Sequence, residues 1–223
     1  MKSAKIARKF LGSSDLAAVF KAIGNKQKNY NWVVTDHDLF TWEEPLRRRF
    51  AWTGVFLSGD ELTGLYIPRC RITFFSAVLS AYPKEIPIRE LRQYPLPEWE
   101  SRRYCQNKPA LLNPRAVIEL VFYDGYELLF LSRRDELVEM FLRAFPQAIG
   151  LAETNRKANH MERRITAIFH REAAARGILL TQEVEKLKYG VFQTLCLSDS
   201  EQEPYDASDR EIVKEVRKLL DRF

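Results

Sequence analysis

The chain has 223 residues, of which 46% are hydrophobic and 29% are charged, and its formal net charge is +5. This balance excludes a disordered chain, and no apolar run approaches the roughly 20 residues that a membrane-spanning helix needs. The basic amino-terminal segment lacks the apolar stretch of a secretory signal peptide, so we expect a cytoplasmic protein without a membrane partner. Cys70, Cys105 and Cys196 lie far apart and outside any CxxC spacing, which indicates ordinary thiols and neither a disulfide framework nor a zinc site.

The positive charge is spread along the chain. Residues 1–155 carry a net charge of +4 and residues 156–223 a net charge of +1. Seven of the first 30 residues are basic, against the single acid Asp15, while later basic residues stand in pairs and triplets among acids. A dedicated nucleic-acid surface usually shows a denser stripe than this. We therefore interpret the charge as a mildly basic, solvated surface.

A helix and then a strand are predicted near the amino terminus. Residues 15–23 have the pattern of a capped helix that ends at Gly24, a residue type favoured at helix carboxyl termini. Residues 30–35 are rich in aromatic and β-branched residues and predict a short strand. The Asp-His-Asp sequence of residues 36–38 predicts a polar turn after it.

Two strands and a short helix are predicted next. Residues 53–57 indicate a strand, and residues 58–66 a helix that begins with a capping box of serine and glutamate. Residues 70–82 are nearly all apolar, with β-branched and aromatic residues leading, which predicts a buried central strand that ends at Pro83. A helix is the alternative there, because so short an apolar run has no decisive period.

Residues 83–114 contain six of the ten prolines and show no sustained period. Proline removes a backbone donor and biases the residue before it away from helix, so we expect a long surface excursion. Long loops inside compact domains are often functional. Tyr94, Trp99 and Tyr104, together with nearby arginines, suit a contact surface or, alternatively, a loop pinned to its own domain.

A hairpin and a helix form the clearest pattern in the chain. Two apolar runs, residues 116–123 and 126–131, flank Asp124-Gly125, which predicts two antiparallel strands joined by a tight turn. Ser132 predicts the amino-terminal cap of a helix over residues 133–145, which a proline then ends. The hairpin places the protein in the mixed α and β class.

The remainder of the chain has only helical patterns. Two further turns are predicted as far as Gly150, and the character of the sequence changes near residue 153. Apolar stripes at helical spacing predict helices over residues 155–176 and 181–196. An acidic linker then leads to Ser208, which begins a capping box and a last amphipathic helix.

We therefore predict an α+β domain over residues 1–153, with an antiparallel or mixed curved sheet packed by helices and a proline-rich excursion at 83–114. A C-terminal three-helix segment follows over residues 154–223. The apolar stripes of these helices must be buried, because most helical stability in proteins comes from packing such a face. If they are not buried within the segment, we expect a homodimer through the C-terminal helices.

Candidates for chemistry are few. Asp36, His37 and Asp38 would suit a metal ligand or a general base at the end of a strand. Adjacent residues of an extended chain point to opposite faces, however, so the three side chains converge only if the turn bends sharply. We interpret them as a polar turn and keep an enzyme centred on them, with Glu43 and Glu44 as further acids, as an alternative.

The two other histidines lie on predicted helices. His160 and His170 are ten residues apart, which does not fit the i,i+4 geometry of a helical zinc site. Glu162 and Glu172 follow them by two residues, and residues at that spacing do not face each other on a helix. There is no glycine-rich phosphate loop and no Gly-x-Ser-x-Gly motif. The sequence thus assigns no catalytic, cofactor-binding or metal-binding residue.

Three segments together resemble small uncharacterised bacterial proteins found among toxin-immunity and related accessory genes. They are residues 20–35, 58–83 and 124–146. The resemblance covers about residues 14–150 and implies a compact α/β domain with a curved sheet and no active site. It rests on turns, caps and a terminal proline, so no functional residue is carried over.

We expect a cytoplasmic bacterial protein that binds another protein, as an immunity or adaptor protein does, and that needs no cofactor. This expectation follows from clear fold signals without a catalytic constellation. The second hypothesis is a nucleic-acid-binding protein that uses the basic amino terminus and Arg163-Arg164 of the helical tail, and whose binding weakens steeply with salt. The third is a carboxylate- or metal-dependent enzyme centred on residues 36–38.

Overall fold

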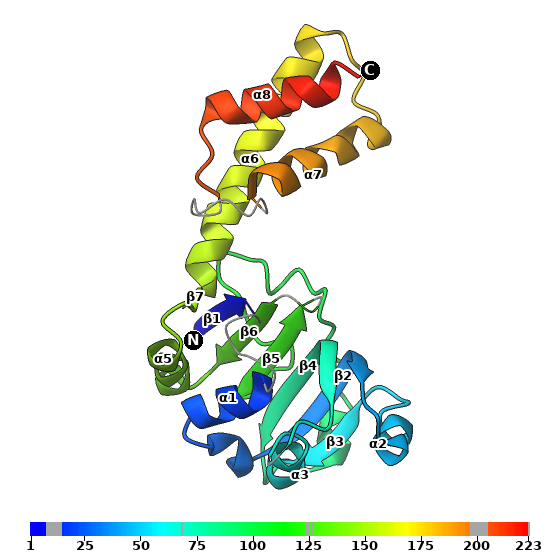
Figure 1. The fold of residues 1–223 in the computed structure, drawn as a ribbon, viewed down its shortest axis with the longest axis vertical. Coiled ribbons are helices and arrows are strands. Elements are labelled where there is room, and N and C mark those ends of the chain that lie inside the picture. Colours follow the sequence, from blue (N-terminus) through cyan, green and yellow to red (C-terminus); the bar gives the residue numbers. More distant parts are fainter. Residues whose placement is uncertain (8–14, 68, 124, 126, 197–204, 223) are drawn as a thin grey trace. The chain divides into compact units, whose positions relative to one another are not determined.

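In the computed structural model the chain forms two compact units, Met1–Glu153 and Thr154–Phe223 (Figure 1). The first unit combines a sheet with helices, and the described part of the second unit consists of helices and their connections. These elements confirm the predicted α+β class with helices at the carboxyl-terminal end. The structure describes residues 1–7, 15–67, 69–123, 125, 127–196 and 205–222.

Seven strands in the described part of the first unit form one sheet, and every neighbouring pair is antiparallel. Their order across the sheet is β3-β2-β4-β5-β6-β1-β7, so β5 is the central strand. Of the two sheet types that the sequence left open, the antiparallel one is observed. The strands are β1 (Lys2–Ala7), β2 (Tyr30–Phe40), β3 (Val55–Ser58), β4 (Thr73–Pro83), β5 (Ile118–Tyr123), β6 (Glu127–Ser132) and β7 (Ile149–Gly150).

The helices follow the predicted order, with two additions that were not predicted. The additions are α2 (Glu44–Arg49) and α4 (Ile88–Leu91), and a 3-10 turn, η2 (Lys26–Asn29), precedes β2. The other helices are α1 (Asp15–Ala22), α3 (Gly59–Gly64), α5 (Asp135–Ala144), α6 (Leu151–Ala175), α7 (Gln182–Cys196) and α8 (Asp209–Leu220).

One face of the sheet packs against α1, α3 and α5 (Figure 1). Successive side chains of a strand alternate between the two faces, and Leu120 and Phe122 of β5 point to this one. Phe130 of β6 stacks on Phe141 of α5, with ring centroids 5.0 Å apart. Most of the buried apolar side chains of the unit belong to the cluster on this face. Each fully buried side chain of this size contributes about 1.5–3 kcal/mol, so this face supplies most of the stabilising burial in the unit.

The proline-rich excursion covers the opposite face. Val78, Val121 and Leu129 of the three middle strands point to that face, where they pack with Tyr104 and Leu111 of the excursion. Of the two interpretations that the sequence left open, a loop pinned to its own domain is therefore observed for this part of the excursion.

The amino-terminal segment forms a strand that was not predicted from the sequence. β1 pairs with β6 on one side and with β7 on the other. Ala4 and Ile6 are buried, while Lys2 and Lys5 pair with Glu139 and with an acid of β6. A run with two lysines and two alanines in six residues has little β-propensity of its own, so pairing within the sheet determines its structure.

The prediction for the connection after β6 is wrong in two places. Ser132 is not the helix cap, because Arg134 occupies that position and Ser132 accepts a hydrogen bond from its backbone N–H at 2.9 Å. Where two further turns were expected as far as Gly150, Ile149 and Gly150 instead form β7 and pair with β1. By contrast, the capping boxes begun by Ser58 and Ser208 are both present.

The helices of the second unit bury their apolar stripes against one another. Met161 and Ile165 of α6, Val191 of α7, and Ile212 and Val216 of α8 all belong to one buried cluster. We expected a homodimer only if these stripes were left unburied within the segment. These residues are buried within it, so they do not meet that condition. In the described part of the chain, no helix has the length and apolar content needed to cross a membrane.

Candidate functional site

Asp36, His37 and Asp38 lie inside β2, so the predicted polar turn is wrong. The register of β2 against β4 shifts between Thr35 and Asp38, and Asp36 has a left-handed backbone with a φ of 43°. Few residues other than glycine adopt this conformation, and aspartate is among those that tolerate it. An irregularity of this kind changes the direction of the side chains around it.

Two of these three residues have structural partners. Asp36 Oδ2 accepts a hydrogen bond from the backbone N–H of Trp99 at 2.9 Å, which ties β2 to the excursion. His37 Nε2 lies 2.9 Å from the carbonyl oxygen of Phe50, which only accepts, so Nε2 is the donor in this contact. Asp38 is exposed. No group of three His, Cys, Asp or Glu side chains in the described part of the chain could hold a metal ion.

A cleft of about 380 Å³ opens beside these residues. It lies where β3 no longer pairs with β2, and its lining comes from β2, from the loop after α2 and from the excursion. The lining residues are Asp36, His37, Phe50, Ala51, Trp52, Thr53, Leu96, Pro97 and Glu98. Two of them are acidic, and none is lysine or arginine. We refer to this cleft as the Trp52 cleft.

Two tryptophans flank α2 and are largely exposed. Trp42 precedes the helix and is 84% exposed, and Trp52 follows it and is 81% exposed. Phe40 packs edge-on against Trp42, with ring centroids 4.6 Å apart. Leu46 of α2 is buried in the core, so the helix is fixed while both indoles face solvent. We call Trp42, α2 and Trp52 together the tryptophan surface.

The charged side chains around α2 pair with one another. The Arg71 guanidinium donates to the Glu43 carboxylate and lowers the pKa of that carboxyl below its usual value. Glu44 pairs with Arg48 at 3.0 Å, and the two remaining arginines of α2 also pair with glutamates. The tryptophan surface is therefore surrounded by balanced charge and differs from the basic stripe typical of a nucleic-acid surface.

A buried carboxylate holds the excursion against the sheet. Glu119 of β5 accepts hydrogen bonds from the phenol of Tyr104 at 3.0 Å and from the backbone N–H groups of Leu112 and Asn113 at 2.9–3.1 Å. Burial raises the pKa of Glu119 to about 7, although these donors act in the opposite direction. Raised pKa values often mark functional sites, but Glu119 has no exposed surface and acts here as an anchor.

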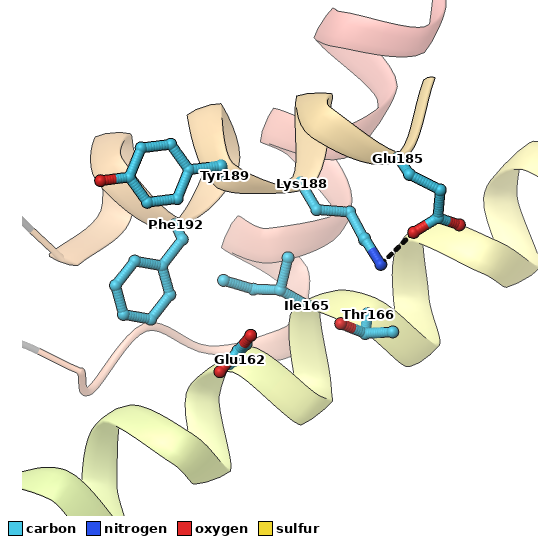
Figure 2. Close-up of a pocket in the computed structure, with 7 residues that line it drawn as sticks. All are labelled: Glu162, Ile165, Thr166, Glu185, Lys188, Tyr189 and Phe192. Carbon is cyan, nitrogen blue, oxygen red and sulfur yellow. Dashed lines mark ion pairs between the residues drawn. The ribbon is translucent and has the colours of Figure 1, made fainter. Parts of the chain in front are cut away.

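The helical unit contains a groove of about 320 Å³ between α6 and α7 (Figure 2). Ile165 and Phe192 contribute to its apolar lining, and Lys188 turns toward Glu185, with which it forms an ion pair. Glu185 also lies 2.8 Å from His170 Nε2. These charged groups are engaged with one another, so this end of the groove favours no particular charge in a ligand.

His170 and Glu172 have separate partners, as their i,i+2 spacing predicted. His170 contacts Glu185 of α7, whereas Glu172 contacts Arg217 of α8 at 2.8 Å. His160 is exposed. They form no common site.

Comparisons with known proteins leave the function open. No family model, curated protein or solved structure matches the chain. The geometry of the described residues is therefore the basis for any functional proposal.

Trp42 and Trp52 are not among the candidate residues predicted from the sequence. A signal was available, because the two tryptophans lie ten residues apart and an arginine triplet lies between them. Tryptophan and arginine are the residue types most enriched among those that dominate the energetics of protein interfaces. Their exposure could not be read from the sequence, since α2 was not predicted.

Proposed function

We propose that the chain is a non-enzymatic protein-binding protein, of the immunity or adaptor kind, and that the tryptophan surface contacts its partner. The exposure of Trp42 and Trp52 carries this proposal. Single apolar residues on a surface are ordinary, but two indoles that are both more than 80% exposed flank one short helix here. Tryptophan is among the residue types most enriched in those that dominate the energetics of protein interfaces.

The tryptophan surface has the properties of a pre-formed contact. The buried Leu46 holds α2 on the core, and the bond between Arg71 and Glu43 secures the segment before the helix. A partner therefore binds side chains whose backbone is already ordered, which lowers the entropic cost of association. A tryptophan at the centre of an interface typically contributes about 2 kcal/mol or more, a factor of about 30 in the dissociation constant.

A bacterial origin and a cytoplasmic location are part of the proposal. The resemblance of residues 14–150 to toxin-immunity and accessory proteins supports the first. The spacing of the three cysteines supports the second, because cysteines outside disulfide or zinc patterns are typical of a reducing compartment.

The two alternatives have less support. For nucleic-acid binding, Lys2 and Lys5 lie within β1 and pair with glutamates, and Arg164 pairs with Asp209 at 2.6 Å. For an enzyme centred on residues 36–38, the bonds described above engage the first two side chains in structural contacts.

Affinity capture from a lysate of the native host tests the proposal. We expect the wild-type chain to retain a specific protein, and the purified partner to bind W42A and W52A at least about 30-fold more weakly. Leu179→Ala is the matched control, because Leu179 is an apolar residue of the helical unit that is 83% exposed. Undiminished binding of the partner by a folded W42A/W52A double variant would contradict the proposal.

A further inference from the structure

We infer that the Trp52 cleft receives a basic side chain, preferably arginine, from the partner protein. This inference rests on the proposed function and names the chemistry of the partner. It stands on the cleft's size, on its charge and on the exposed indole at its edge.

The cleft has room for one long side chain. Its volume is about 380 Å³, and it is bounded by Trp52 on the α2 side and by Leu96 and Pro97 on the excursion side. A single side chain that projects from a partner's surface fits the available space.

The charge of the lining selects a cation. Asp36 and Glu98 are its charged residues, and in the described part of the chain neither has an ion pair. The carboxylate of Asp36 accepts a hydrogen bond from the backbone N–H of Trp99 and has no cationic side chain paired with it. The arginines of α2 are paired with glutamates outside the cleft. An anion, including a nucleic-acid phosphate, is therefore repelled here.

The exposed indole favours arginine among the cations. A guanidinium group is planar, stacks on an aromatic face and can donate to a carboxylate in a bidentate manner. Trp52 supplies the aromatic face, and Glu98 supplies an exposed carboxylate in the same lining. Leu96 and Pro97 offer apolar contacts to the aliphatic stem, as long basic side chains commonly require.

A nuclear magnetic resonance titration of the full chain tests this inference. The probes are the blocked tripeptides Gly-Arg-Gly, Gly-Lys-Gly and Gly-Glu-Gly, and tetramethylammonium as a free small cation. The readout is the indole N–H signal of Trp52, assigned with Trp52→Phe. We expect a saturable shift with the arginine peptide, a weaker response to the lysine peptide and to tetramethylammonium, and none to the glutamate peptide.

Two charge-reversal variants separate the cleft from the general charge of the surface. We expect Glu98→Lys to weaken binding of the arginine peptide at least about 10-fold. Glu100→Lys is the control, because Glu100 is exposed, lies two residues away and is not in the lining, and it should bind within about 2-fold of wild type. An unchanged amide spectrum in both variants shows that folding is preserved.

Three results would overturn the inference: no saturable shift of Trp52, a stronger response to tetramethylammonium or to the glutamate peptide than to the arginine peptide, or equal weakening by the two variants. The proposed function fails separately. If the host partner binds and Glu98→Lys leaves its affinity unchanged, the inference is wrong and the protein-binding function stands. If the arginine peptide binds and no partner depends on the two tryptophans, the inference stands and the function does not.

Discussion

The phenol of Tyr104 donates a hydrogen bond to the carboxylate of Glu119 over 3.0 Å, and both side chains are fully buried. Tyr104 belongs to the proline-rich excursion and Glu119 to the central strand. The same carboxylate accepts from the backbone of Leu112 and Asn113, so it fixes two parts of the excursion at once. Because Leu96, Pro97 and Glu98 also line the Trp52 cleft, we infer that this anchor helps to hold one wall of the cleft.

We expect Glu119→Gln to change the pH dependence of stability. The folded-state pKa of Glu119 is raised to about 7, above the ordinary value of 4.5, so at intermediate pH the folded chain retains a proton that the unfolded chain has released. Its contribution is therefore present at acidic pH and lost as the pH rises through 7. We expect the free energy of unfolding of E119Q, relative to wild type, to rise by about 2–3 kcal/mol between pH 5 and pH 8.

Urea unfolding followed by tryptophan fluorescence measures this difference, because all four tryptophans lie in the first unit. Glu100→Gln, an exposed acid of the same excursion, should show no such trend. A difference between E119Q and wild type that is the same at both pH values would show that Glu119 does not titrate in this range.

Gly59 is required by a close approach of two backbones. A Cβ atom there would lie 2.4 Å from the Gln27 carbonyl oxygen and 2.6 Å from Lys28 Cα, and neither backbone atom can move aside as a flexible side chain would. We expect Gly59→Ala to lower the free energy of unfolding by about 1–3 kcal/mol in the same assay. Gly64→Ala, in the same helix, meets no atom within 4 Å and should be neutral or stabilising by up to about 1 kcal/mol. Equal effects of the two variants would contradict this explanation.

Glu172 should contribute to the acid sensitivity of the helical unit. The guanidinium groups of Arg217 and Arg176 donate to its carboxylate and lower its pKa to about 2. The folded-state pKa lies below the unfolded one, so the contribution is present above about pH 4.5 and is lost as the pH falls toward 2. We expect Glu172→Gln to destabilise the unit by about 1–2 kcal/mol at pH 7 and by less at pH 2.5.

Thermal unfolding followed by circular dichroism at 222 nm measures this effect, because α6 to α8 contain most of the α-helical residues in the described part of the chain. Glu162→Gln changes an exposed acid of α6 in the same way and serves as the control. If Glu172→Gln and Glu162→Gln melt alike at pH 7, the contacts with Arg217 and Arg176 do not stabilise the unit.

Local signals in the sequence predicted local structure well. Both capping boxes are present because the serine and the glutamate three residues later satisfy each other's backbone within a single turn. The hairpin strands β5 and β6 pair around Gly125, whose φ of 70° suits the tight turn predicted there. Such elements need little information from the rest of the chain.

Elements that depend on distant partners were not predictable in the same way. β1 becomes a strand because β6 and β7 flank it, and residues 36–38 continue β2 because β4 pairs with Thr35 before them and with Asp38 at their end. The bond from Trp99 to Asp36 joins residues 63 positions apart, so the sequence around Asp36 gave no sign of it. The candidate site combines β2, the loop after α2 and the excursion, and only the tertiary fold brings these three segments together.

Oxidative footprinting of the tryptophans, with and without the captured partner, tests the central claim most directly. Trp32 is fully buried and serves as an internal control, whereas Trp42 and Trp52 are open to the oxidant in the free chain. If the tryptophan surface is the interface, the partner should slow oxidation of Trp42 and Trp52 several-fold and leave Trp32 unchanged. Oxidation of Trp42 and Trp52 at the same rate in the complex as in the free chain would contradict the claim.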